Sequence, residues 1–400
     1  MRFDRSFCGP LLRFLIVVLA SCVSGNGAQA ENRLWVEATI NGKPVHLAFD
    51  TGASALVLFP KAVARLGLSY TNAPKDAPVN PGEAPAGITE ECDVQLSSDP
   101  GRTVRTSFRV GEIPGILATD VDGLVGWPSV RDDIILMIEA RQGIVSALTS
   151  IPGDITNWTK FKILTKSGVL RLEPLKLSDR QSIIHVDTGA QNGVSLSPDQ
   201  WREWKAVHTN QPMTLVAYYT PAAGLVVTEE SWAQRLAIGE LLLKDVPVME
   251  ADKAHIPYGS VTLGLAALRC LDLIIDAKGG FAYLRPKGTR PPPYGHNRLG
   301  AVFTPVDLQS EDLIARVVRG SPGWEAGIRN GDVLTRIGEL DVTKWRTDPA
   351  VLPLSRFWAR AAGTKIELSL RRGKEVFKTE VVLRQILSPE TSSLGNISHE

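Results

Sequence analysis

The sequence predicts a mainly β protein with two related halves and a separate domain behind them. Three observations support this prediction. The motif Asp-Thr-Gly-Ala occurs at residues 50–53 and again at residues 187–190. Each copy follows a short apolar run of strand length and composition. A proline-rich stretch, residues 287–297, then separates the two halves from a C-terminal segment with a pattern of its own, residues 298–387.

The composition is that of an ordinary globular protein. The chain has 400 residues, of which 44% are hydrophobic and 22% are charged, so it has enough material for more than one core. Lysine and arginine number 44, and aspartate and glutamate number 43, which leaves a formal net charge of +1. This balance argues against a protein that binds nucleic acid by neutralising phosphates, and no nucleic-acid partner is expected.

The N-terminal segment, residues 1–30, is typical of an export signal. An apolar run over residues 11–20 follows a basic start and is short for a bilayer span. Two cleavage sites compete: Ala-Gln-Ala at 28–30 suits ordinary secretion, and Leu-Ala-Ser-Cys at 19–22 resembles a bacterial lipobox. The lipobox is favoured because Cys22, the residue that would carry the lipid, directly follows the apolar run. A buried N-terminal helix is the third alternative. We therefore expect a periplasmic or cell-envelope protein that contacts the membrane through a lipid anchor only.

Two cysteines, Cys92 and Cys270, lie beyond the signal region. An exported protein could pair them, but they belong to different halves, and free, partly buried thiols are an equal alternative. Two thiols do not make a thiolate zinc site of the usual kind, and the histidines are scattered. No metal or other cofactor is expected.

Two landmarks recur at matched spacing in both halves. Asp50 and Asp187 open the two motif copies. An apolar-apolar-glycine segment ends at Gly126 in the first half, and another ends at Gly264 in the second. The spacing from aspartate to glycine differs between the halves by a single position. Landmarks in the same order at nearly the same spacing indicate a duplication.

Each half also predicts the same elements in the same order. These are a hairpin whose second strand ends at the aspartate, a helix that starts at a proline, and a late buried strand that runs into a charged turn. In the first half, residues 33–150, the hairpin strands are 34–40 and 45–49 around the turn Asn41-Gly42. The helix starts at Pro60, and the late strand with its turn is 135–143. In the second half, residues 160–286, the hairpin strands are 169–177 and 183–186. The helix starts at Pro198 with Ser197 as N-cap, and the late strand with its turn is 272–280.

The paired motifs resemble those of retropepsin-like and pepsin-like aspartic proteases, over about residues 33 to 286. The resemblance implies two retropepsin-like β lobes that form one pepsin-like bilobal unit, with a peptide or protein as substrate. Asp50 and Asp187 would be the catalytic pair, and a monomer would suffice because one chain supplies both halves. The residues implied to support the catalytic loops are Thr51, Gly52, Ala53, Ser54, Thr188, Gly189, Ala190, Gly126 and Gly264.

The chemistry of peptide hydrolysis explains these residue types. Two adjacent carboxylates cannot both be charged, so they share one proton and titrate as a pair. The ionised carboxylate acts as general base on a water, and the protonated one polarises the scissile carbonyl. In the family a threonine hydroxyl bonds to the opposite loop, a role implied here for Thr51 and Thr188. A single such aspartate is more often a turn residue at a strand end, and the duplication is what favours catalysis. Ser54 and Gln191 differ after the two motifs, so an asymmetric support is expected.

The family also needs a hairpin that closes over the substrate and excludes water. Two segments are candidates, residues 81–91 in the first half and residues 214–226 in the second. Tyr218 and Tyr219 lie in the second segment, where packing is the commoner role for aromatic residues.

Residues 298–387 resemble a bacterial PDZ domain, a β-sandwich with a helix, at 299–303, 317–328 and 331–334. Such a groove captures a chain terminus: backbone N–H groups hold the carboxylate, and the peptide adds a strand. A C-terminal peptide ligand is therefore expected, with a closed packing module as the alternative because Phe357 and Trp358 could fill the groove. The implied peptide-binding residues are Leu299, Gly300, Ala301, Val302 and Phe303.

The linker, residues 287–297, is polar and stiff, so few contacts are expected to cross it. Residues 388–400 are expected to form a flexible tail. The leading function is an aspartic endopeptidase with a domain for substrate or C-terminus recognition. The alternative is a catalytically silent bilobal scaffold, or a peptide-binding protein that acts through its PDZ domain. Both motifs are retained, which favours the enzyme because a scaffold has no need of two apposed carboxylates.

Overall fold

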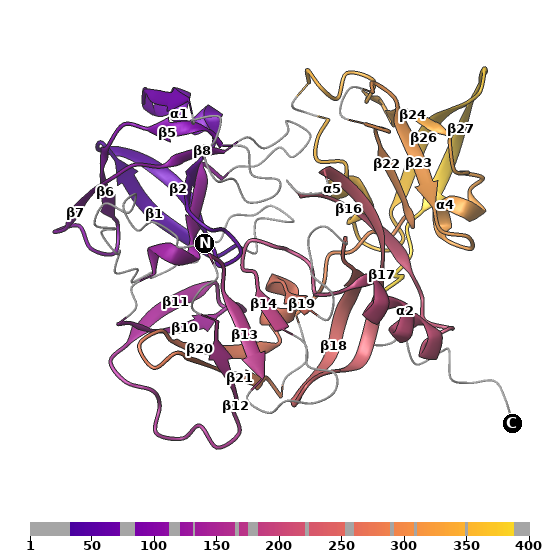
Figure 1. Ribbon diagram of the computed structural model, residues 1–400. Helices are drawn as coiled ribbons and strands as arrows, with labels where there is room; N and C mark the ends of the chain where they lie inside the picture. The colour runs from indigo at the N-terminus through magenta and orange to yellow at the C-terminus, as the bar shows by residue number, and fades with distance from the viewer. Residues whose placement is uncertain are drawn as a thin grey trace, which may run out of the picture.

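The computed structural model describes residues 33–72, 85–111, 121–130, 133–164, 168–174, 183–220, 224–252, 260–288, 292–307, 310–348 and 351–387 (Figure 1). The signal region with Cys22, part of the first closing-hairpin candidate and the tail at 388–400 lie outside these residues. Below, the first half means residues 33–150, the second half residues 160–286, and the C-terminal domain residues 298–387.

The described residues form a mainly β fold with three sheets, which confirms the predicted class. The first sheet contains β1 (Trp35–Ile40), β2 (Lys43–Asp50), β3 (Leu56–Leu58), β4 (Tyr70–Asn72), β5 (Pro85–Thr89), β6 (Cys92–Leu96), β7 (Thr103–Thr106), β8 (Arg109–Gly111) and β9 (Gly123–Gly126), in the order β4-β5-β8-β3-β9-β2-β1-β6-β7.

The second sheet contains β10 (Ile135–Glu139), β11 (Ile144–Leu148), β12 (Thr159–Ile163), β13 (Arg171–Pro174), β14 (Ile183–Val186), β15 (Val194–Leu196), β16 (Thr214–Thr220), β17 (Gly224–Ile238), β18 (Leu241–Glu250), β19 (Ser260–Leu263), β20 (Leu271–Asp276) and β21 (Phe281–Pro286). Its order is β11-β10-β20-β21-β12-β13-β14-β19-β15-β18-β17-β16.

The third sheet lies in the C-terminal domain and has the order β22-β23-β24-β26-β27, with β25 paired to β24. Its strands are β22 (Ala301–Thr304), β23 (Leu313–Val317), β24 (Val333–Ile337), β25 (Leu340–Asp341), β26 (Lys365–Arg372) and β27 (Glu375–Val382). The helices of the described residues are α1 (Pro60–Leu66), η1 (Trp127–Ser129), α2 (Pro198–Val207), α3 (Leu265–Leu268), α4 (Pro322–Glu325) and α5 (Ser355–Trp358).

Local sequence signals locate the elements next to the two motifs. β1 and β2 pair antiparallel around Asn41 and Gly42, whose φ angles are 49° and 76°, as a two-residue hairpin turn of this composition requires. Helices α1 and α2 begin at the predicted prolines, Pro60 and Pro198. The backbone N–H of Ser197 donates to Oε1 of Gln200 at 3.1 Å, which forms a capping box.

The two halves use the same strand pairings around their motifs. β2 runs parallel to β9, and β14 runs parallel to β19. β3 then pairs antiparallel with β9, as β15 does with β19. Each motif therefore follows a strand that is hydrogen-bonded to the apolar-glycine segment of its own half.

A joint sheet ties the first half to the second. The sequence predicts 135–143 and 272–280 as matching strands of separate halves, and in the structure these two segments pair with each other. Strand β10 lies antiparallel to β20, with Ile135 opposite Asp276 and Ile138 opposite Leu273. One hydrophobic core accordingly runs through both halves, whereas the C-terminal domain has a core of its own.

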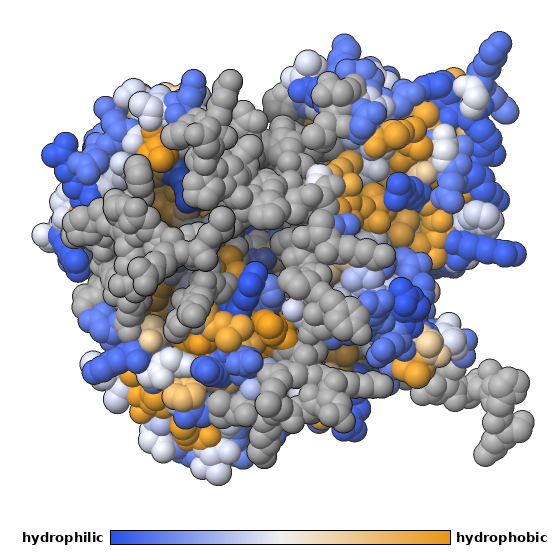
Figure 2. Space-filling model, viewed as in Figure 1, coloured by the Kyte–Doolittle hydropathy of each residue, from blue (hydrophilic) through white to orange (hydrophobic). Residues whose placement is uncertain are grey.

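The C-terminal domain stands beside the hairpin formed by β16 and β17 (Figure 1). Figure 2 shows hydrophilic residues around much of the outer rim of this face, with an apolar patch on the C-terminal domain. Within the described residues Cys92 and Cys270 are buried and free, which decides between the two alternatives for the cysteines. No described helix is both long and apolar enough to cross a membrane.

Candidate active site

Asp50 and Asp187 occupy equivalent positions in the two halves. Asp50 ends β2 and lies opposite Gly126 of β9. Asp187 directly follows β14, and its backbone N–H donates to the carbonyl of Leu263 at 3.0 Å. Each aspartate thus leaves a buried strand beside the apolar-glycine segment, and the loop after it is free to turn toward the other half.

The two loops bring the carboxyl groups together. Oδ1 of Asp50 accepts hydrogen bonds from the N–H groups of Gly52 and Ala53 at 2.8 and 3.1 Å. Oδ1 of Asp187 accepts equivalent bonds from Gly189 and Ala190 at 2.9 and 3.0 Å. The two carboxyl groups lie close enough for the negative charge of Asp187 to act directly on Asp50.

Glycine is required beside each carboxyl group because the opposite loop approaches so closely. A Cβ atom at Gly52 would lie 2.6 Å from Cγ of Asp187, and one at Gly189 would lie 2.4 Å from Cγ of Asp50. Both separations are well inside van der Waals contact, so any side chain would push the carboxyl groups apart. The crossed approach shows that each loop packs on the aspartate of the other half.

Thr51 and Thr188 hold the two loops in register. The hydroxyl of Thr51 donates to the carbonyl of Val186 at 2.6 Å and accepts from the N–H of Thr188 at 3.1 Å. The hydroxyl of Thr188 donates to the carbonyl of Phe49 at 2.7 Å and accepts from the N–H of Thr51 at 3.0 Å. Both side chains are buried, so the four bonds are shielded from water.

Burial raises the pKa of Asp50 to about 8, and the negative charge of Asp187 adds to the shift. The N–H groups of Gly52 and Ala53 act in the opposite direction because they stabilise the charged form. At neutral pH Asp50 therefore keeps its proton beside the negative charge of Asp187.

The apolar-glycine segments lie directly beneath the loops. The carbonyl of Ala53 accepts from the N–H of Trp127 at 3.0 Å, and the carbonyl of Ala190 accepts from the N–H of Leu265 at 2.8 Å. Cβ atoms at Gly126 and Gly264 would lie 2.4 Å from backbone oxygens of Ala55 and Asn192. The two supports are thus alike, but the positions after the motifs differ. Ser54 is half-buried and Gln191 is exposed.

The two closing-hairpin candidates differ in their strand pairing. In the first half, the described part of residues 81–91 includes β5, which is paired with β4 and β8. In the second half, residues 214–226 include the predicted hairpin strands, with β16 paired to β17. The hydroxyl of Tyr218 accepts from the N–H of Asp252 at 3.1 Å, so this side chain is bonded within the second half.

The backbone N–H groups assigned to terminal-carboxylate binding already have an acceptor. The N–H groups of Leu299 and Gly300 donate to Oδ1 of Asn297 at 3.0 and 3.2 Å. Residues 299–303 are all buried. Trp358 packs against Phe303 with ring centroids 5.7 Å apart. These contacts match the closed-groove alternative rather than a groove open to a chain terminus.

The expectation that few contacts cross the linker is wrong. The hydroxyl of Tyr294 donates to the buried carboxyl of Glu230, and its ring packs near Trp232. Nδ2 of Asn297 donates to the carbonyls of Leu215 at 3.0 Å and of Ala301 at 2.8 Å, so this side chain joins β16 to β22. The prolines did not separate the domains because the residues after them carry buried hydrogen-bonding groups.

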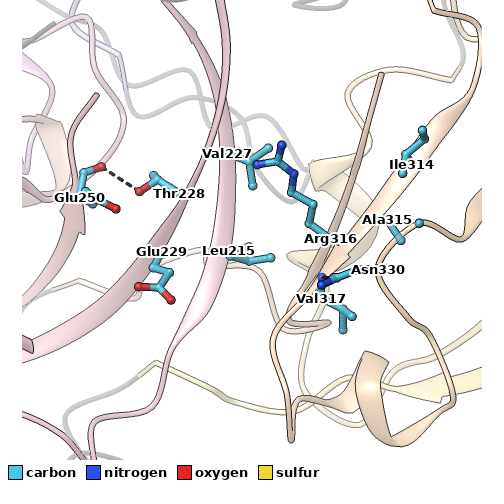
Figure 3. Close-up of a pocket in the computed structure, with 11 residues that line it drawn as sticks. Leu215, Val227, Thr228, Glu229, Glu250, Ile314, Ala315, Arg316, Val317 and Asn330 are labelled. Carbon is cyan, nitrogen blue, oxygen red and sulfur yellow. Dashed lines mark hydrogen bonds between the residues drawn. The ribbon is translucent and has the colours of Figure 1, made fainter. Parts of the chain in front are cut away.

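A cavity of about 470 Å³ lies between the hairpin β16–β17 and the C-terminal domain (Figure 3). Leu215, Val227 and Glu229 line it from the hairpin, and Arg316 and Asn330 line it from the C-terminal domain. In Figure 3, Arg316 extends toward Val227. Besides lining this cavity, the two parts are in contact at β16 and β22.

A second, smaller cavity adjoins Asp187, and sequence reasoning missed its lining residues other than Gly52 and Asp187. Arg171, His185 and Thr262 are among them. Their one sequence signal is the period-two alternation of strands β13, β14 and β19, which places them opposite the core-facing residues. No group of three or more histidine, cysteine, aspartate or glutamate residues in the described part of the chain is placed to hold a metal ion.

One comparison with known proteins bears on this geometry. Residues 36–128 match a family model described as aspartyl protease. No curated protein matches the chain. The matched segment contains Asp50 and Gly126 and ends before the second motif. The match shows that this segment is similar to aspartyl proteases, and it supports a protease, a hydrolase, in general terms.

Proposed function

We propose that this chain is an aspartic endopeptidase whose two halves form a bilobal catalytic unit, with Asp50 and Asp187 as the catalytic pair. The observation that carries the proposal is the crossed approach of the two loops, in which Gly52 packs on the carboxyl group of Asp187 and Gly189 packs on that of Asp50. Burying two carboxyl groups side by side is costly. A scaffold has no use for that cost, whereas peptide hydrolysis requires it.

The chemistry follows from the shared proton. A water between the carboxyl groups gives a proton to the ionised carboxylate as its oxygen attacks the carbonyl carbon of the peptide. The protonated carboxyl group donates a hydrogen bond to the carbonyl oxygen, which becomes negative in the transition state. Collapse of the tetrahedral intermediate then breaks the C–N bond. The carboxyl group that took the proton of the water passes it to the leaving nitrogen. The N–H groups of Gly52 and Gly189 hold the inner carboxylate oxygens, so the outer ones face the water.

Substitution of the pair tests the proposal. Asp50→Asn and Asp187→Asn should each reduce cleavage of a peptide library by roughly 10⁴-fold, and the double variant should be no worse than either, because the pair acts as one unit. Asp93→Asn, at an exposed position in β6, is the matched control and should retain full activity. Turnover above a few per cent of wild type in either single variant of the pair would exclude the assignment.

A single chain is proposed as the active unit. Both carboxyl groups come from one polypeptide, so a second copy has nothing to add to the pair. Specific activity should stay constant on dilution to nanomolar concentration. A loss of activity that follows dissociation in sedimentation would instead require a dimer.

The C-terminal domain is proposed to be a PDZ-like module that is docked on the second half. Asn297 supplies a side-chain oxygen where a bound peptide would supply its terminal carboxylate, and Trp358 packs against the strand to which a peptide would add. Capture of a free C-terminus in this groove is therefore not part of the proposal. Export, with lipidation at Cys22, remains part of it.

A further inference from the structure

A cavity of about 120 Å³ adjoins the carboxyl pair on the side of Asp187. Gly52 of the opposite loop lines it together with Asp187, so the cavity lies where the two halves meet. A substrate side chain held there would lie next to the bond under attack. The other lining residues are Val169, Leu170, Arg171, His185, Val186 and Thr262.

Three polar residues form one row along this cavity. Arg171 of β13 is the Cα partner of His185 in β14, and His185 is the partner of Thr262 in β19. Side chains in one such row project from the same face of a sheet. The neighbouring residues Leu172 and Ile184 are fully buried in the core, so the polar row projects from the opposite face, toward the cavity.

Arg171 brings an unsatisfied donor to the cavity. Its Nε atom is buried and has no hydrogen-bond partner among the described residues. A guanidinium group carries a positive charge, and its fork of donors matches a carboxylate. Buried donors are almost always paired, so a ligand with acceptor oxygens would complete this site.

The equivalent row in the first half has the opposite character. Trp35 is the Cα partner of Ala48, which is the partner of Leu124. These residues pack with Phe59 and Val121 in a small apolar cluster. The two sides of the carboxyl pair therefore present different chemistry to a substrate, although their backbones are paired in the same way.

We propose that the cavity beside Asp187 is a substrate subsite that selects an acidic side chain, aspartate or glutamate, next to the scissile bond. Arg171 is the specificity-determining residue, and His185 and Thr262 lie beside it. The proposal rests on the protease function proposed above and specifies its substrate class. An acidic side chain close to Asp187 would be repelled by the charge of the catalytic pair, and the guanidinium of Arg171 offsets that repulsion through a charge-assisted hydrogen bond.

Matched peptides test this selectivity. The peptides differ only in the two residues that flank the cleaved bond, where glutamate, glutamine, leucine or lysine is placed. Wild-type enzyme should cleave a glutamate peptide with kcat/KM about 10 to 100 times that of its glutamine counterpart, the range expected for one hydrogen bond to a charged group. Arg171→Leu should bring this ratio close to one, and Arg171→Glu should shift the preference toward lysine.

Two comparisons distinguish selectivity from a general effect on the enzyme. Arg171→Leu should raise KM for the glutamate peptide and leave the shape of the pH profile unchanged, whereas a residue that tuned the catalytic pair would shift that profile. Trp35→Leu, at the equivalent place in the first half, is the matched control and should keep the glutamate-to-glutamine ratio of the wild type. If Arg171→Leu does not fold, Arg171→Gln is substituted, and its ratio should also fall toward one.

The outcomes separate this proposal from the one on which it rests. A wild-type ratio near one, or a high ratio that persists in the Arg171 variants, would overturn the acidic subsite and leave the protease in place. Absence of cleavage of every peptide by wild-type enzyme would overturn the protease function, and the subsite with it.

Discussion

Thr51 and Thr188 each donate a hydroxyl hydrogen bond across the boundary between the two halves and accept a backbone N–H in return. The acceptors, the carbonyls of Val186 and Phe49, belong to the residues directly before each aspartate. The two threonines thus determine the separation of the carboxyl groups without touching them. A change in either threonine acts on both halves at once.

Removal of one hydroxyl should weaken both the fold and the chemistry. Thr51→Val leaves the carbonyl of Val186 and the N–H of Thr188 unpaired in a buried site, so we expect a loss of about 2–4 kcal/mol of stability from two unsatisfied groups. The carboxyl pair should also lose its alignment, and kcat should fall. Urea unfolding and peptide cleavage measure the two effects. Thr51→Ser keeps the hydroxyl and should behave like wild type; a valine variant equal to wild type in both assays would contradict the role.

The raised pKa of Asp50 predicts a loss of activity in mild alkali. Below about pH 8 the pair keeps its shared proton, and above it the proton that polarises the scissile carbonyl is lost. Cleavage of a peptide without titratable side chains should therefore decline as pH rises through about 8. A rate that is flat from pH 6 to 10 would show that the pair does not hold a proton in this way.

The same pKa predicts the pH dependence of stability. The pKa of Asp50 is raised on folding from 3.8 to about 8, so its contribution to stability is fully present below pH 3.8 and is lost as pH rises through 8. Asparagine does not titrate. The melting temperature of wild type should therefore fall relative to that of Asp50→Asn between pH 5 and pH 9. A constant difference between the two proteins across that range would be inconsistent with burial of a carboxyl group.

Tyr294 should be needed for docking of the C-terminal domain. Burial raises the pKa of Glu230 to about 7, and the Tyr294 hydroxyl opposes that shift by donating to the carboxyl group. Burial of Glu230 costs stability as pH rises through 7 and the carboxyl group ionises, and the hydroxyl offsets that cost because it stabilises the charged form. Tyr294→Phe should therefore cost about 1.5–3 kcal/mol at pH 8 and less at pH 5, as measured by urea unfolding.

A double variant and a truncation complete that test. Glu230→Gln removes the charge, so adding it to Tyr294→Phe should restore much of the stability lost at pH 8. A chain that ends at Pro286 lacks both Tyr294 and Asn297 and uncovers their partners on the second half, so it should be less soluble and less stable than the full chain. A soluble truncation with unchanged stability would show that the C-terminal domain is an independent appendage.

Export can be tested at Cys22. Because Cys22 directly follows the apolar run of the signal, Cys22→Ala should abolish incorporation of labelled fatty acid. Ordinary secretion would be the correct alternative if wild type takes up no label and its mature N-terminus is Glu31.

Local chemistry made much of this protein predictable. Asn41-Gly42 specifies a hairpin turn, Pro60 and Pro198 specify helix starts, and the repeated motif marks two loops that end buried strands. These features depend on residues a few positions apart, whose backbone preferences act regardless of the rest of the chain. The duplication also pointed to Asp50 and Asp187 as a pair, because a repeat places equivalent residues in equivalent environments.

Pairing between distant segments determined the strand partners, the contacts of the C-terminal domain and the lining of the cavity beside Asp187. Nothing in the pattern of β10 indicates that its partner is β20, since one apolar strand can pair with many others. The side chain of Asn297 takes the N–H groups of Leu299 and Gly300 because the docked hairpin positions it there, and so a motif typical of an open groove became part of a closed interface. Arg171 lines the cavity beside Asp187 through strand register, although it belongs to a different strand from the one that leads into Asp187. Composition and spacing do not predict such neighbours, because contact between distant segments depends on how the whole chain packs.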